Sequence, residues 1–108
     1  NMDAPPPPPS GPRVVFIPYD DPPVAMSPIR PVYPEIAQEA GIEGVLVVQA
    51  FIDEKGRVKE TLILKGVPNT GLDEAAMDAI RKTRFRPAKQ RERPVAVWIS
   101  IPVNFKLK

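Results

Sequence analysis

The chain has 108 residues, and 15 Lys and Arg against 13 Asp and Glu leave a formal net charge of +2. It contains no Cys and no His, which excludes a Cys nucleophile, a Ser-His-Asp triad, a Cys/His zinc site and c-type haem attachment. No apolar run approaches the roughly 20 residues that a membrane-spanning helix needs.

Proline dominates the first part of the chain. Twelve of the 16 prolines lie in residues 1–34, and five of them form the run at residues 5–9. Such a run favours polyproline II, an extended helix without internal hydrogen bonds. We interpret residues 1–28 as a semi-rigid spacer, the alternative being a ligand for an SH3-type partner. Residues 14–17 are apolar and β-branched, and they predict a short strand able to add to a sheet edge.

Residues 29–108 carry the alternating apolar pattern of one small domain. Residues 34–41 predict a short helix that begins at Pro34 and ends at Gly41. Residues 44–52 alternate with a period of two, which predicts a strand. Residues 53–56 then predict a four-residue hairpin loop, with Gly56 supplying a positive φ, and residues 57–65 return as a second strand.

Residues 71–84 predict the clearest helix, because apolar and small side chains recur on one face with a 3.6-residue period. Asn69 or Thr70 is expected to cap its start. Residues 95–105 predict a long last strand whose odd-numbered positions are all apolar. The positively charged residues between this helix and this strand are interpreted as a solvated loop.

The expected fold is therefore α+β, with the order α-β-β-α-β after an extended proline-rich segment. A right-handed crossover places the last strand beside the first, which gives a small antiparallel three-stranded sheet of order 2-1-3 with two helices on one face. The last strand then lies at an edge, where Pro102 is tolerated because proline donates no ladder hydrogen bond. An edge over residues 96–100 is predicted to accept an extended peptide.

The second face of the sheet is unusually apolar for a face in contact with water. The apolar residues that the pattern places there are Val45, Val47, Phe51, Leu62, Leu64 and Trp98. Either residues 14–17 or a second chain covers part of this face, or these are the scattered apolar residues that ordinary protein surfaces carry.

A basic cluster between residues 81 and 93 holds seven positive charges, offset only by Glu92. It suits acidic receptor loops, phospholipid headgroups, peptidoglycan or nucleic acid, and the alternative is a solvated loop after a helix. Nucleic acid is not expected, because only Phe85 interleaves the charges and the whole chain is near neutral.

The acidic pairs do not indicate catalysis. Asp20-Asp21, Asp53-Glu54 and Asp73-Glu74 each fall at a predicted turn or helix start, where acidic residues are ordinary. We therefore expect no enzymatic activity, no cofactor and no metal.

As a set, residues 29–107 resemble the C-terminal domain of TonB-type energy transducers. The matching positions are Tyr33-Pro34, Ala37, Gly41, Gly44, Leu46, Val48, Asp53, Gly56-Arg57-Val58, Leu72-Asp73, Ala76, Ala79, Arg84-Phe85, Pro87-Ala88 and Pro102-Val103-Asn104-Phe105. The family fold is an antiparallel three-stranded sheet with two helices on one face, in agreement with the pattern above.

The resemblance implies a role in transport across a bacterial envelope. The parent protein would be anchored in the inner membrane with ExbB and ExbD, and its spacer would cross the periplasm. The domain would bind the TonB box of outer-membrane transporters as an added strand and transmit proton-motive force for siderophore or cobalamin uptake. A homodimer is a further arrangement that an exposed edge allows.

The resemblance also implies two partner-binding stretches. One precedes and includes the Tyr-Pro pair, and the other lies on the last strand: Ile29, Arg30, Pro31, Val32, Tyr33 and Pro34, then Val95, Ala96, Val97, Trp98, Ile99, Ser100 and Ile101. Two other functions stay open, a TonB-like module of a sensor or secretion system and a basic surface-binding module for nucleic acid, lipid or cell wall.

Overall fold

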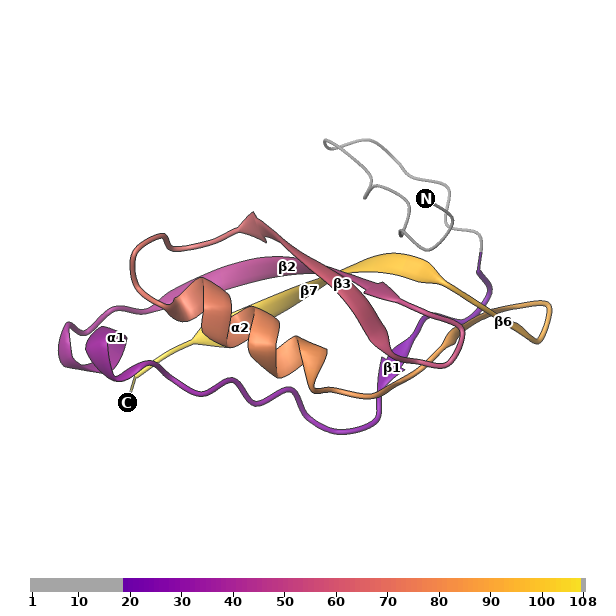
Figure 1. Ribbon diagram of the computed structural model, residues 1–108, viewed down its shortest axis with the longest axis horizontal. Helices are drawn as coiled ribbons and strands as arrows, with labels where there is room; N and C mark the ends of the chain where they lie inside the picture. Colours follow the sequence, from indigo (N-terminus) through magenta and orange to yellow (C-terminus); the bar gives the residue numbers. More distant parts are fainter. Residues whose placement is uncertain (1–18, 108) are drawn as a thin grey trace.

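The computed structural model describes residues 19–107. The central elements are three long strands and two helices, and four short strands lie at one end of the molecule (Figure 1). In chain order the elements are β1 (Val24–Ala25), α1 (Glu35–Glu39), β2 (Gly44–Ile52), β3 (Val58–Lys65), α2 (Leu72–Arg81), β4 (Phe85–Arg86), β5 (Ala88–Gln90), β6 (Arg93–Val95) and β7 (Val97–Phe105).

The central sheet has the strand order β3-β2-β7, and both pairings are antiparallel. This confirms the predicted order 2-1-3 and the placement of the last long strand beside the first. The β2–β7 register runs from Gly44 opposite Phe105 to Ile52 opposite Val97 without a shift. β3 carries two irregularities against β2, which leave β2 and β7 as the regular part of the sheet.

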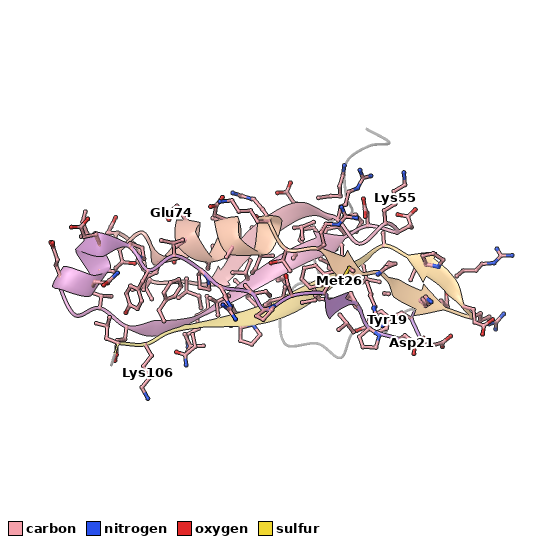
Figure 2. The ribbon with its side chains drawn as sticks, turned by 90° about the horizontal axis from the view of Figure 1, so that it is seen from below. Tyr19, Asp21, Met26, Lys55, Glu74 and Lys106 are labelled. Carbon is pink, nitrogen blue, oxygen red and sulfur yellow. The ribbon has the colours of Figure 1, made fainter. Side chains whose placement is uncertain are left out.

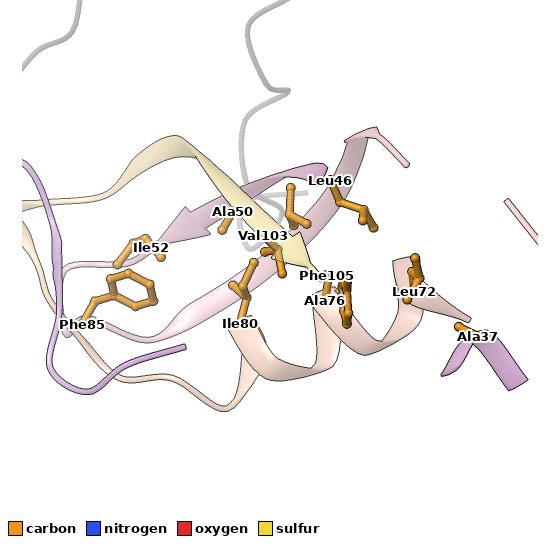
Figure 3. Close-up of a cluster of buried hydrophobic side chains, with 11 residues drawn as sticks. Ala37, Leu46, Ala50, Ile52, Leu72, Ala76, Ile80, Phe85, Val103 and Phe105 are labelled. Atoms are coloured by element: carbon orange, nitrogen blue, oxygen red, sulfur yellow. The ribbon is translucent and has the colours of Figure 1, made fainter. Parts of the chain in front are cut away.

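Both helices pack on the same face of the sheet. The side chains of Leu46, Val48, Ala50 and Ile52 point from β2 into one buried cluster, where they meet Ala37 of α1 and Leu72, Ala76 and Ile80 of α2 (Figure 3). Val103 and Phe105 of β7 join the same cluster. Because α2 contacts β3 and β2, it covers the half of this face that lies away from β7.

The hairpin between β2 and β3 has the predicted loop. The Asp53 carboxylate accepts the backbone N–H groups of Lys55 and Arg57, at 2.9 and 2.8 Å. Gly56 has a φ of 78°. A Cβ at this position would lie 1.8 Å from the carbonyl oxygen of Phe85, so glycine is required here both by the backbone conformation and by the close approach of β4.

The start of α2 differs from the prediction. The N-cap residue is Gly71, with a φ of 79°, and no side chain caps the helix. The hydroxyl of Thr70 instead accepts the N–H of Leu72 and donates to the carbonyl of Val67, so it stabilises the preceding turn. Asp73 accepts the N–H of Val67 at 2.8 Å, which ties the first turn of the helix to the end of β3.

Four short strands were not predicted from the sequence. β1 pairs with β4, and β5 pairs with β6 in a hairpin whose turn residues Arg91 and Glu92 both have positive φ. The charged residues of the segment 81–93 are exposed, as a solvated segment would have them, but the segment contains short strands rather than a plain loop. The segment 20–25, called the anchor segment below, pairs with β4 and β5 even though it falls within the expected spacer.

Within residues 19–107, no helix is long and apolar enough to cross a membrane. The predicted strand at residues 14–17 lies outside the described residues.

Candidate functional site

The outer side of β7 is the first candidate for a binding surface. Asp53 donates its backbone N–H to the carbonyl of Arg57, so the odd-numbered backbone groups at the end of β2 face β3. The even-numbered groups of β2 therefore face β7. Their register partners on β7 are odd-numbered, and the odd-numbered backbone groups of β7 must face inward.

The even-numbered backbone groups of β7 consequently point away from β2. Pro102, opposite Val47, agrees with this assignment because it has no N–H to give to a neighbouring strand. Ser100 and Asn104 are exposed, as is Pro102. In the part of the chain that the structure describes, β7 is the outer strand of the central sheet, and its outward groups at Ser100 and Asn104 suit pairing with another extended chain.

The predicted strand over residues 95–105 is interrupted near its start. Val95 ends β6 and pairs with Ala88, whereas Val97 begins β7 and pairs with Ile52. Ala96 joins the two strands and belongs to neither. The break arises where β2 ends and the β5–β6 hairpin supplies the next neighbouring strand.

The second predicted stretch is part of the strap, which we define as residues 26–34. The strap runs from β1 to α1 (Figure 1), and seen from below it lies between α2 and β7 (Figure 2). Ile29 and Tyr33 pack against the buried cluster. Arg30 and Val32 are exposed, Val32 by 81%.

Tyr33 fixes the end of the strap. Its ring packs edge-on against Phe105, with centroids 5.2 Å apart and planes at 84°. Its hydroxyl donates to the carbonyl of Ile42, and Gln38 donates to its backbone carbonyl at 3.1 Å. Removal from water, assisted by the charge of Glu43, raises the pKa of the phenol above its ordinary value.

The two predicted stretches thus lie on the same side of the molecule but are not in one patch. Tyr33 contacts Phe105 at the far end of β7. Val97, eight residues earlier, lies about 26 Å away along an extended strand. The strap therefore meets β7 near the end of that strand, through Tyr33 and Phe105, and Arg30 and Val32 are exposed a few residues before this contact.

The second face of the sheet carries the apolar residues expected there. Val45, Leu62 and Leu64 are 48%, 43% and 59% exposed. Phe51 and Trp98 are opposite each other in the register and pack with ring centroids 5.5 Å apart. Trp98 is therefore half-buried against its own sheet.

The basic cluster lies at the end of the molecule formed by the short strands. Lys82 pairs with Asp78, and Arg84 donates to the carbonyl of Lys55 at 3.4 Å. Arg81 is exposed at the end of α2. The other four cationic residues lie on β4, β5, β6 and the turn between the last two, and all are exposed: Arg86, Lys89, Arg91 and Arg93. This clustering on defined strands was not apparent from the sequence.

One member of each acidic pair has a structural partner. Asp53 binds the β2–β3 loop, Asp73 binds the N–H of Val67, and Asp20 accepts the N–H of Arg91 at 2.6 Å. Burial raises the pKa of Asp53, but the N–H groups of Arg57 and Lys55 and the Arg57 charge outweigh this and lower it overall. Among residues 19–107 no three acidic groups lie together as a metal site would require.

Comparison with known proteins identifies relatives of this architecture. Residues 29–107 match the family described as Gram-negative bacterial TonB protein C-terminal. Protein TonB of Vibrio cholerae is 34% identical over 89 residues, covering 82% of this chain and 36% of that protein. Protein TonB of Pseudomonas aeruginosa is 40% identical over 86 residues, covering 80% of this chain and 25% of that protein.

The solution NMR structure of the Pseudomonas aeruginosa TonB CTD superposes with a TM-score of 0.67 at 31% identity, covering 82% of this chain and 90% of that chain. The chain therefore spans between a quarter and about a third of the length of these two sequence relatives.

Proposed function

The chain belongs to the TonB C-terminal domain family, and from that premise we propose that it is the receptor-binding domain of a TonB-type energy transducer. In this proposal, the domain binds the TonB box of an outer-membrane transporter as a strand added beside β7. The observation that carries the proposal is the outer side of β7, where even-numbered backbone groups face away from β2.

Strand addition suits a domain that serves several transporters. The added peptide is held mainly by main-chain hydrogen bonds. Every residue except proline has the N–H that these bonds require, so many peptide sequences are accepted. Each such bond contributes only about 0.5–1.5 kcal/mol net. Binding by a few of them is weak and reversible, which allows release after each transport event.

We assign the partner contacts to two stretches. Residues 95–101 supply the backbone edge, and residues 29–34 flank it from the strap. Arg30 and Val32 are exposed side chains within this stretch, and we assign them a contribution to the choice of transporter. Tyr33 also holds the end of the strap against β7 through its ring contact with Phe105.

The rest of the proposal concerns the parent protein. An inner-membrane anchor associates with ExbB and ExbD, and residues 1–28 extend through the periplasm as a spacer ahead of the domain at 29–108. The last part of that spacer, residues 20–25, is already paired with β4 and β5. Proton-motive force transmitted along this chain opens the transporter for siderophore- or cobalamin-type cargo.

An amide NMR titration tests the proposal directly. The isotopically labelled full chain is titrated with an eight-residue peptide that contains the TonB box of a TonB-dependent transporter. We expect chemical-shift changes along residues 97–104 and at residues 30–33, persisting at moderate salt. A peptide with proline at alternate positions, which cannot pair, serves as the control. Changes confined to the basic cluster at residues 81–93, with steep salt dependence, would refute strand addition.

A further inference from the structure

The outward-facing edge continues beyond the start of β7. β6 precedes β7 with only Ala96 between them, and β6 pairs on its inner side with β5. Pro94, opposite Lys89, has no N–H, so it removes no hydrogen bond between β5 and β6 when it faces outward, and it offers no donor to an outer neighbour. Counted along the chain, Pro94 has the same even parity as the outward-facing positions Ser100 and Asn104 of β7, and Ala96 alone joins the two strands.

This outer side ends at a basic turn. Arg91 and Glu92 have φ values of 51° and 66°, the backbone geometry of a two-residue type I′ hairpin turn. Gln90, Arg91 and Arg93 line a pocket at the tip. Both arginines are exposed, and neither guanidinium forms an ion pair within residues 19–107.

The turn is held in place by the anchor segment. The carboxylate of Asp20 accepts the backbone N–H of Arg91, and the N–H groups of Asp20 and Asp21 donate to the carbonyl of Lys89 at 2.7 and 3.1 Å. Lys89 donates back to the carbonyl of Asp21 at 3.0 Å. The Asp20 carboxylate is thus engaged by the backbone, and the arginine side chains extend from a fixed base.

From this arrangement we propose that Arg91 and Arg93 form a subsite for carboxylate side chains at one end of the peptide added to β7. The inference rests on the proposed function, because it requires a strand beside β7. A peptide paired opposite Ser100 that continues past Val97 passes β6 and reaches the turn. Seven residues separate Ser100 from Arg93, about 23 Å in an extended chain. Allowing for the length of an arginine side chain, the carboxylate lies about five to seven residues from the peptide residue opposite Ser100.

The expected selectivity is modest and dependent on salt. Exposed ion pairs stabilise a complex by an amount that corresponds to about a two- to fivefold change in Kd each. Glu92 in the same turn reduces the attraction. Two ion pairs formed at low ionic strength therefore lower the Kd of an acidic peptide by up to about tenfold relative to a neutral one. Salt screens most of this difference because both arginines are in water.

The experiment uses three peptides that share one neutral core able to pair with β7. One carries two glutamines at each end, one has the N-terminal pair replaced by glutamates, and one has the C-terminal pair replaced. Both acidic peptides are needed because either strand direction is compatible with the edge. Dissociation constants are measured with the full chain by fluorescence anisotropy, at low and at high salt.

We expect one of the two acidic peptides to bind about three- to tenfold more tightly than the neutral peptide at low salt, with the gain reduced at high salt. The double variant Arg91→Gln/Arg93→Gln should lose this gain but bind the neutral peptide as before. The matched control is Lys59→Gln/Lys65→Gln, which removes the same charge from exposed positions on β3 at the opposite edge of the sheet.

Three outcomes would overturn the inference. Equal binding of all three peptides, or a gain that survives in the arginine variant, removes the role of the turn while leaving strand addition intact. A gain lost equally in the lysine control shows a general charge effect. Absence of binding by the neutral peptide refutes the proposed function itself, and the carboxylate subsite with it.

Discussion

Replacement of Ser100 by proline removes one outward-facing backbone N–H from β7 and leaves the inward hydrogen bonds to β2 in place. Loss of one main-chain bond, together with a peptide carbonyl left without a partner, costs about 1–3 kcal/mol of binding free energy. This corresponds to about a 5- to 150-fold increase in Kd.

The fold should tolerate this change. Ser100 is exposed, and the preceding residue is already extended, as a residue before proline prefers to be. Pro102 occupies an equivalent outward position two residues later. We expect the Ser100→Pro variant to lose no more than about 1 kcal/mol of its free energy of unfolding.

The assay measures peptide binding by calorimetry and unfolding by urea on the same samples. Ser100→Ala keeps the N–H and should bind normally. Ile101→Pro removes an N–H that faces Val48, and should destabilise the fold by about 3 kcal/mol. Unchanged peptide binding in Ser100→Pro, with a folded protein, would refute the assignment of the outer side of β7.

Three further predictions concern stability. Gly56→Ala should lower the free energy of unfolding by about 2–4 kcal/mol in urea, because the left-handed backbone disfavours a Cβ and Phe85 must move. Tyr33→Phe should cost about 0.5–1.5 kcal/mol, a difference that vanishes above pH 10 as the phenol, whose pKa is raised by burial and by Glu43, ionises in the wild type. Because the pKa of Asp53 is lowered in the folded state, its carboxylate stabilises the fold fully above about pH 4. This stabilisation is lost as the pH falls through the folded-state pKa. Asp53→Asn should therefore make the free energy of unfolding less dependent on pH at acid pH.

The central sheet was predictable because each part of it leaves a local or a periodic signal. The alternation in residues 44–52 and 95–105 defines the faces, and Pro102 indicates which side of the last strand is open. Gly56 marks the hairpin loop and takes the predicted positive φ. These signals agree with one another, so the strand order followed from a single crossover rule.

The short strands at the basic end left no such signal. Their turn contains Arg91 and Glu92 rather than the Asn-Gly or Asp-Gly pairs that usually identify a two-residue hairpin. The contact of Asp20 with Arg91 spans 71 residues in the sequence. Strands of two or three residues are also too short to show alternation, and pairing of β1 with β4 depends on tertiary contacts alone.

In the proposed function, tension from the parent protein would enter the domain through the anchor segment. A pull applied at residue 19 reaches the hydrogen bonds between Asp20, Asp21 and Lys89 before it reaches the strap. From Lys89 the load passes through β5 into β6 and, along the covalent chain, directly into β7. Neither helix lies on this path. While those bonds hold, tension is carried by the strands nearest the outer edge, and α1 and α2 remain unloaded.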